Sequence, residues 1–197
     1  MKDLNFSLSR NKTLNIPIKR KFCAALISNN WSTDGFRFKF INELNKYKKV
    51  DMGGKAFNNI GKIIERKKGI QFFSEYKFSI SMENSEGDGY ISEKIVNSLK
   101  SGTIPIYYGD YMVDEYINPK TYILIKGEKD INEKIEYIKK IDNNDKIYKD
   151  ILKAKVLLDE KIVDDTNKEL KDFLFNIFEQ DKSKAFRKTK LKNNELL

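Results

Sequence analysis

The sequence has no histidine, one cysteine and only three prolines among its 197 residues. Because histidine is the commonest general base, its absence excludes Ser/His/Asp catalysis and most zinc sites. The only cysteine, Cys23, cannot form a disulfide within the chain, and its surroundings KFCAALI predict a small buried side chain. This cysteine usage favours a reducing, cytoplasmic setting. No apolar run approaches the ~20 residues that a membrane-spanning helix needs.

Acidic residues are outnumbered, since 38 Lys and Arg face 29 Asp and Glu and give a net charge of +9. Such a balance favours anionic partners: phosphates, nucleic acid or an acidic membrane face. A nucleic-acid-binding protein would show clustered lysines among exposed aromatic residues, whereas the aromatic residues here recur at core spacing. We therefore expect no nucleic-acid partner, and a solvated basic surface is the simplest interpretation of the excess charge.

Short apolar runs alternate along the chain with segments of helical periodicity. Strands are expected at 21–28, near 50, at 77–82, 103–109 and 122–125, and helices at 35–49, 68–76, 91–100, 130–141 and 170–178. The apolar stripes of these helices, including that of the last one, are expected to be core positions. Because strands that alternate with helices imply βαβ units, we predict an α/β fold with a mostly parallel sheet.

Three segments are expected from the composition. Residues 1–19 are polar and irregular, residues 20–180 carry all the periodic segments and form one domain, and residues 181–197 form a basic, frayed tail. The tail could contact an anionic membrane at its inner face, which would make the protein peripheral, although a solvated tail is the simpler interpretation.

The stretch ENSEGDGYISEK, residues 83–94, follows an expected strand and precedes an expected helix. In open α/β sheets, ligands bind outside the carboxyl ends of the strands, and the amides of a helix N-terminus attract anions. Lys94 would add a positive charge there, and Tyr90 could donate a hydrogen bond to a phosphate oxygen. The Glu93 carboxylate could accept hydrogen bonds from a ribose diol, and Asn84 offers both a donor and an acceptor. This chemistry alone supports a phosphate site and a polar surface loop equally well.

The longer stretch YKFSISMENSEGDGYISEKIVNSLKSGTIPIYYGD, residues 76–110, closely resembles the signature of the α1,3/α1,4-fucosyltransferases, glycosyltransferase family 10. The family pattern runs from a Tyr-Lys-Phe strand through Phe-Glu-Asn-Ser to Tyr-x-Thr-Glu-Lys, and then through Gly-Thr-x-Pro to a strand ending in Gly. Met82 and Ser92 replace the usual Phe and Thr with residues of the same character. The segments RKFCAALISNN, GFRFKFINEL, YKKVDMGGKAFNNIG and NPKTYILI extend the likeness to bacterial members over residues 20–180.

This resemblance implies the C-terminal half of a GT-B glycosyltransferase: a Rossmann-like, mostly parallel sheet with helices on both faces that binds a nucleotide sugar. Members transfer L-fucose from GDP-β-L-fucose to N-acetylglucosamine or glucose in a glycan, with inversion, so the resemblance to bacterial members implies acceptors such as lipopolysaccharide or glycoproteins. By motif, Tyr90 and Lys94 would contact the diphosphate, Glu93 the ribose, Asn84 the phosphate side of the loop, and Arg37 a phosphate. No cofactor and no metal are expected, because these cations and a helix N-terminus would carry the charge of the departing GDP. Glu83 is expected to be structural.

The resemblance implies an enzyme of two GT-B domains, and this sequence is similar only to the donor-binding one. The acceptor site and the general base belong to the N-terminal domain in the family, so no catalytic residue is identified here. We expect the chain to need a separate acceptor domain and to turn over poorly alone. Two alternatives stay open: a non-catalytic module that binds a GDP-sugar, and a GT-B transferase for another sugar nucleotide.

Overall fold

A computed structural model describes residues 20–28, 35–85, 87, 89–159 and 161–181, so the expectation for residues 1–19 and most of the expected tail fall outside the described residues. The chain divides into two compact units, residues 1–158 and 159–197, which are described separately below. The single domain expected over 20–180 stays a prediction.

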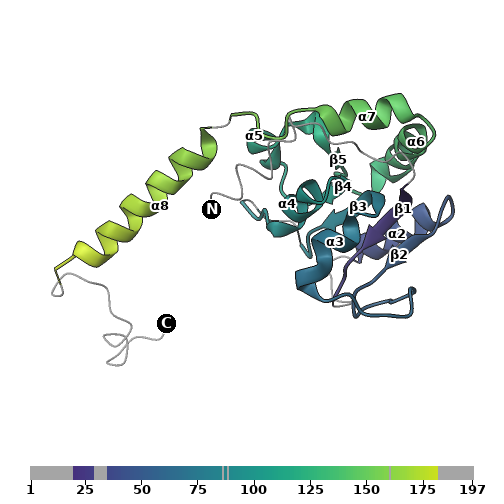
Figure 1. Ribbon diagram of the computed structural model, residues 1–197, viewed down its shortest axis with the longest axis horizontal. Helices are drawn as coiled ribbons and strands as arrows, with labels where there is room; N and C mark the ends of the chain where they lie inside the picture. The colour runs from purple at the N-terminus through teal and green to yellow at the C-terminus, as the bar shows by residue number, and fades with distance from the viewer. Residues whose placement is uncertain (1–19, 29–34, 86, 88, 160, 182–197) are drawn as a thin grey trace. The chain divides into compact units, whose positions relative to one another are not determined.

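The first unit is built on a five-stranded parallel sheet (Figure 1). Its strands are β1 (Lys21–Ala25), β2 (Val50–Met52), β3 (Tyr76–Met82), β4 (Ile104–Tyr108) and β5 (Ile123–Leu124). Their spatial order is β2-β1-β3-β4-β5, so the chain moves outward from β1 to β2 and then returns to β3 on the other side of β1. The carboxyl ends of β1 and β3 therefore flank a topological switch point, which is where open α/β sheets bind ligands.

Helices cover both faces of this sheet. They are α2 (Phe36–Asn45), η1 (Arg66–Lys68), α3 (Gly69–Phe73), α4 (Glu93–Lys100), α5 (Val113–Tyr116), η2 (Pro119–Thr121), η3 (Glu128–Asp130), α6 (Ile131–Asp142) and α7 (Asp145–Lys153). Cys23 packs in one large apolar cluster with α2, α6 and α7, whereas its neighbour Ala24 packs with α3 in a second cluster. Because successive strand residues point to opposite faces, the two clusters lie on opposite sides of the sheet. The predicted α/β architecture is thus confirmed.

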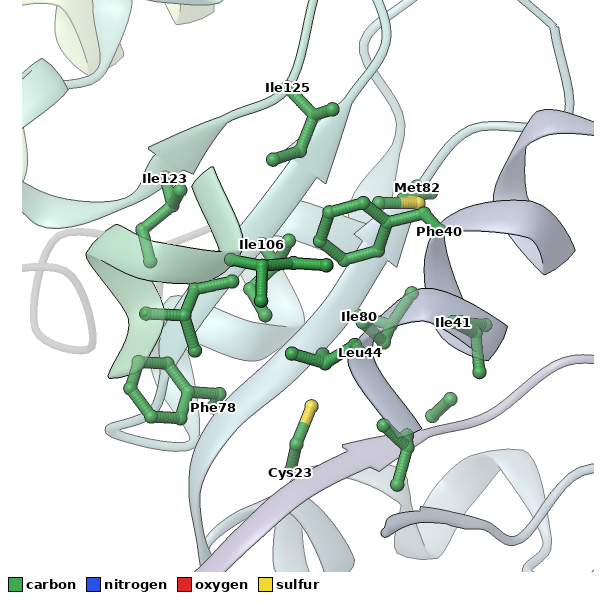
Figure 2. Packing of buried hydrophobic residues seen from close by; sticks show 14 of the residues in the cluster. Cys23, Phe40, Ile41, Leu44, Phe78, Ile80, Met82, Ile106, Ile123 and Ile125 are labelled. Carbon is green, nitrogen blue, oxygen red and sulfur yellow. The ribbon is translucent and has the colours of Figure 1, made fainter. Parts of the chain in front are cut away.

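The larger cluster joins the sheet to the helix that follows β1. Figure 2 shows Phe40 and Leu44 of α2 among the side chains of β1 and β3, such as Cys23 and Phe78. The helical spacing of Phe36, Phe40 and Leu44 in the sequence explains why this face of α2 is buried. Burial of this stripe fixes where the rest of α2 meets the ends of the strands.

Hydroxyl groups hold α4 on the opposite face. Ser81 and Ser98 lie 2.6 Å apart between their Oγ atoms, and Ser79 Oγ lies 2.6 Å from Thr103 Oγ1. Ser101 Oγ adds a hydrogen bond to the carbonyl oxygen of Ser98 at 2.7 Å. The alternation of Phe78, Ile80 and Met82 predicts β3 but suggests one buried face, whereas Ser79 and Ser81 are buried too. Directional hydrogen bonds on this second face fix the position of α4.

A buried carboxylate binds the amino end of β3 to the helices around it. Asp142, at the end of α6, receives hydrogen bonds from Lys77 Nζ at 2.9 Å, Lys48 Nζ at 2.5 Å and the Tyr47 hydroxyl at 3.0 Å. Lys77 Nζ also donates to the carbonyl oxygen of Asp142 at 2.7 Å. Because Lys77 lies at the start of β3, this cluster ties α6 to the amino end of that strand.

The structure differs from the sequence-based expectation in several helices: the short helices α5 and η2 lie where no element is expected, and two longer helices differ as well. Residues 145–153, for which no element is expected, form α7, whose N-cap Asn144 accepts hydrogen bonds from the amides of Lys146 and Ile147. In the second unit, the stripe of α8 (Ile162–Glu179) is not core, so that expectation is wrong. Its large apolar side chains are 42–80% exposed, namely those of Leu170, Phe173, Leu174, Phe175, Ile177 and Phe178. Periodicity predicts the helix and its apolar face, but it does not supply a packing partner.

Candidate functional site

The site predicted from the sequence lies where β3 ends and α4 begins. Glu83 extends the pairing of β3 with β4, because its amide donates to the carbonyl oxygen of Tyr108 at 2.8 Å. Beyond it the chain turns through Gly87 and Gly89 before α4 starts at Glu93. Gly89 has φ +74°, a left-handed conformation that suits glycine. The loop is therefore at the carboxyl end of the sheet, next to the switch point.

Arg37 and Asn84 are brought together across this edge. Arg37 stands in the first turn of α2, and only 3% of its surface is exposed, because the same helix buries Phe36 and Phe40 against the sheet. Its Nη1 donates to Oδ1 of Asn84 at 2.7 Å. The two residues are 47 positions apart in sequence. The fold thus brings the guanidinium group of α2 to the amide at the start of the loop. Both groups are expected to face phosphate.

Lys94 is held by a carboxylate that the sequence did not single out as part of the site. The side chain of Glu83 has 0% exposure, and its Oε2 forms an ion pair with Lys94 Nζ. Its Oε1 accepts hydrogen bonds from the amide of Ser92 at 3.0 Å and from the Ser92 hydroxyl at 2.6 Å. Ser92 in turn caps α4, with its Oγ accepting from the amide of Lys94 at 3.4 Å. The lysine expected to add a positive charge at this place is therefore ion-paired.

Glu93 and Tyr90 lie on the exposed side of the same loop. Glu93 Oε1 accepts a hydrogen bond at 2.8 Å from Nη2 of Arg66, which comes from the short helix η1. Both side chains are more than half exposed, so water weakens this ion pair. Tyr90 is exposed as well, and its amide donates to the carbonyl oxygen of Gly87 at 2.9 Å. Arg66 is a residue that sequence reasoning missed, because 27 positions separate it from its partner.

A second buried carboxylate holds the far end of the loop. Asp110, two residues after the end of β4, accepts a hydrogen bond from the amide of Gly89 through Oδ2 and from the amide of Met112 through Oδ1 at 2.9 Å. Between the strand and this aspartate, Gly109 leaves no space for a side chain, since an added Cβ would lie 2.5 Å from the Tyr107 hydroxyl. The loop is thus fastened at its start by Asn84 and at its end by Asp110.

The chemistry of this edge suits an anionic ligand with a polar sugar. The amides at the N-terminus of α4 and the cations Arg37 and Lys94 can stabilise phosphate oxygens, while Glu93 can accept hydrogen bonds from hydroxyl groups. Burial raises the pKa of the nearby Tyr107 hydroxyl, so that group stays protonated and adds no negative charge. Among the residues that the structure describes, no group of three or more Cys, Asp or Glu is placed to hold a metal ion.

The fold is a Rossmann-like α/β domain with a parallel sheet, of the class found in GT-B glycosyltransferases. The family model "Glycosyltransferase family 10 (fucosyltransferase) C-term" matches residues 16–179. The chain therefore belongs to glycosyltransferase family 10, through its C-terminal domain, and the resemblance seen in the sequence is confirmed.

Named relatives and solved structures agree with this family. The alpha-(1,3)-fucosyltransferase FucT of Helicobacter pylori is 36% identical over 136 residues, which are 69% of this chain and 28% of the relative. The human 4-galactosyl-N-acetylglucosaminide 3-alpha-L-fucosyltransferase 9 is 32% identical over 135 residues, which are 68% of this chain and 36% of the relative. A crystal structure of an alpha1,3-fucosyltransferase with GDP-fucose is 30% identical, with a TM-score of 0.71 over 87% of this chain and 51% of that chain. The chain thus spans about a quarter to a half of the proteins it matches.

Proposed function

We propose that this chain is the donor-binding part of a fucosyltransferase that takes L-fucose from GDP-β-L-fucose and transfers it, with inversion, to a hydroxyl group of N-acetylglucosamine or glucose in a glycan. The observation that carries the proposal is the position of the family stretch: its described residues follow β3 at the switch point of the sheet, with Arg37 bonded to Asn84 and Lys94 in the first turn of α4. The similarity to an alpha1,3-fucosyltransferase solved with GDP-fucose supports the choice of donor.

Each residue of the site has a role in this proposal. Lys94 and Tyr90 contact the diphosphate, Arg37 and Asn84 act together on the phosphate side, and Glu93 accepts hydrogen bonds from the ribose. Breaking the sugar–phosphate bond leaves additional negative charge on GDP, and these fixed donors stabilise that charge as it develops. The transfer then needs no metal. Equal GDP binding with EDTA and with Mg²⁺ would support this part of the proposal, and binding only with Mg²⁺ would refute it.

Turnover in this proposal also needs an acceptor domain that supplies the general base and the glycan site. The matched part of this chain covers 28% of one relative and 51% of a solved structure, so both are longer than this chain. We expect the chain by itself to bind GDP and GDP-fucose and to transfer fucose poorly or not at all. Adding a family N-terminal domain in trans and following transfer to N-acetyllactosamine and to lipopolysaccharide oligosaccharides tests this expectation and the class of acceptor.

The first test is calorimetric titration of the chain with GDP, GMP and UDP. GDP should bind best, and Lys94→Ala should weaken GDP binding about tenfold, the usual size for loss of a charge-assisted hydrogen bond. Lys153→Ala, which removes an exposed lysine at the end of α7, is the matched control and should leave affinity unchanged. A folded chain that binds none of these nucleotides would refute the proposal, and preference for UDP would favour the alternative of another sugar nucleotide.

The ribose contact has its own test. The wild-type chain should prefer GDP over 2′-deoxy-GDP, because the missing hydroxyl leaves the Glu93 carboxylate without one of its donors. Glu93→Ala should bind both nucleotides with similar affinity. If the variant kept the full preference for GDP, Glu93 would not be the residue that contacts the ribose, and its ion pair with Arg66 would be its only role.

Location is proposed from the exposed apolar face of α8 and the basic residues after Asp181. Within the described residues, no helix is long and apolar enough to cross a membrane. We propose a cytoplasmic protein of a bacterium that contacts the anionic inner face of the membrane through this end of the chain. Sedimentation with vesicles that contain phosphatidylglycerol tests the contact, and a chain ending at residue 158 should lose it. Equal sedimentation of both chains would refute the assignment.

A further inference from the structure

The carboxylate of Glu83 collects hydrogen bonds from the first turn of α4. It has 0% side-chain exposure and three partners: the amide and the hydroxyl of Ser92, and the ammonium group of Lys94. The two oxygens are divided between them, Oε1 for Ser92 and Oε2 for Lys94. One side chain therefore fixes both the cap of α4 and its first cation.

A lysine at this place in a helix needs such a partner. Lys94 is the second residue of α4, and the N-terminus of a helix carries partial positive charge that repels a cation. Without a carboxylate, its flexible stem would carry the ammonium group outward into water. With Glu83 and the Ser92 hydroxyl as partners, two of the three ammonium N–H bonds are engaged. The side chain keeps 30% exposure, so the third N–H can meet a ligand.

The chain also makes room for Glu83. A Cβ added at Gly109 would lie 2.9 Å from Cγ of Glu83, closer than such contacts occur in proteins. The absence of a side chain at position 109 thus leaves room for the side chain of Glu83. Its place at the end of β3 is fixed by the hydrogen bond of its amide to Tyr108. The backbone of Glu83 is accordingly fixed by the sheet, and its carboxylate binds the first turn of α4 through Ser92 and Lys94.

We propose that Glu83 is a positioning residue for nucleotide binding, which keeps the Lys94 ammonium group at the N-terminus of α4 before the ligand arrives. The inference rests on the proposed function, because the ligand it serves is the diphosphate of the nucleotide. Glu83 acts through Lys94 and Ser92 and does not touch the ligand.

A second effect of Glu83 has the opposite sign and makes the inference testable. Its negative charge lies close to the expected phosphates and should repel them. If positioning dominates, removing or shortening the side chain weakens GDP binding. If repulsion dominates, removing the charge strengthens it.

Two variants separate the effects. Glu83→Gln keeps the shape and an acceptor for Ser92 but loses the charge that holds Lys94, whereas Glu83→Asp keeps the charge but is one methylene shorter. We expect both to raise the dissociation constant for GDP about tenfold. Asp142→Asn is the matched control, since it removes another buried carboxylate paired with lysines at the other end of β3. It should bind GDP like the wild type while folded.

Two further readouts exclude a merely structural role. In the Lys94→Ala background, Glu83→Gln should change GDP affinity less than twofold, because Lys94 is gone and the glutamine still offers an acceptor to Ser92. NMR of the ¹⁵N-labelled lysine ammonium groups, without nucleotide, should show a slowly exchanging Lys94 signal, identified by its loss in Lys94→Ala, that also disappears in Glu83→Gln and Glu83→Asp. The signal of Lys77, which is bonded to Asp142, should persist in all three variants.

The outcomes separate this inference from the proposed function. GDP binding by the wild type that is unchanged or strengthened in Glu83→Gln overturns the positioning role alone. Full additivity of the two substitutions, or a Lys94 ammonium signal that persists in both Glu83 variants, also overturns it. No GDP binding by the folded wild type refutes the proposed function and the ligand role together, while the ammonium signal still reports whether Glu83 holds Lys94.

Discussion

Replacing Asp142 with Asn should destabilise the first unit without affecting the candidate site. The Asp142 side chain is 3% exposed and accepts from Lys77, which is 12% exposed, and from Lys48, which is 47% exposed. Asn has the same shape but offers no negative charge, so the substitution leaves the buried ammonium group of Lys77 without its counter-ion.

The magnitude follows from the exposure of the two lysines. Removing one partner of a fully buried ion pair costs about 3–5 kcal/mol, whereas a solvent-exposed pair contributes about 0–1 kcal/mol. Lys77 keeps its hydrogen bond to the carbonyl oxygen of residue 142, which offsets part of the loss. We expect a decrease of about 2–3 kcal/mol in the free energy of unfolding, or about 5–10 °C in Tm for a unit of this size.

The effect should depend on pH in a defined direction. Burial alone would raise the pKa of Asp142, but hydrogen bonds from Lys48, Lys77 and Tyr47 outweigh burial and lower it below its ordinary 3.8. A carboxyl group with a lowered folded-state pKa stabilises the protein above the unfolded-state value and loses this contribution as pH falls through the folded-state value. The stability difference between wild type and Asp142→Asn should therefore be constant from about pH 7 to 5 and shrink below about pH 4.

Urea denaturation followed by circular dichroism at several pH values measures this difference. Asp150→Asn, at an exposed position of α7, is the control and should change stability by less than about 0.5 kcal/mol. A loss in Asp142→Asn as small as that of the control would refute the reasoning, as would a difference that does not shrink in acid.

Two other predictions concern residues buried in the same unit. Gly54→Ala should destabilise by at least about 2 kcal/mol in urea denaturation, because a Cβ at residue 54 would lie 2.0 Å from the carbonyl oxygen of Ile27. A stable alanine variant would mean that the backbone there moves freely. Cys23 is 1% exposed and burial raises its pKa, so iodoacetamide should label it only after unfolding. Fast labelling of the native chain would contradict its place in the core.

The family motif was accessible to sequence reasoning because its residues are close together in the chain. Asn84, Tyr90, Glu93 and Lys94 lie within one strand–loop–helix segment, so local periodicity alone places them at the end of a strand. Arg37 needed the family resemblance, since nothing near it in sequence indicates a site. The α/β class followed in the same way from elements whose apolar runs are short and regular.

Contacts between distant residues were not accessible to that reasoning. The bond from Arg37 to Asn84 and the ion pair of Glu93 with Arg66 depend on how α2 and η1 meet the ends of the strands. The pairing of Lys94 with Glu83 changes the chemistry most, because the ammonium group expected to meet the ligand is already bound to a buried carboxylate.

The sequence by itself determined most of the elements, the class of fold, the family and the loop of the candidate site, because periodicity and motifs are local properties of a chain. The tertiary structure alone decided which charges are paired, which faces are buried and where α4 is fixed. Those properties depend on distances between segments far apart in sequence, as the exposed stripe of α8 and the buried carboxylate of Glu83 show. The local pattern of residues specifies which secondary structure a segment can form, and tertiary packing specifies which residues its side chains contact.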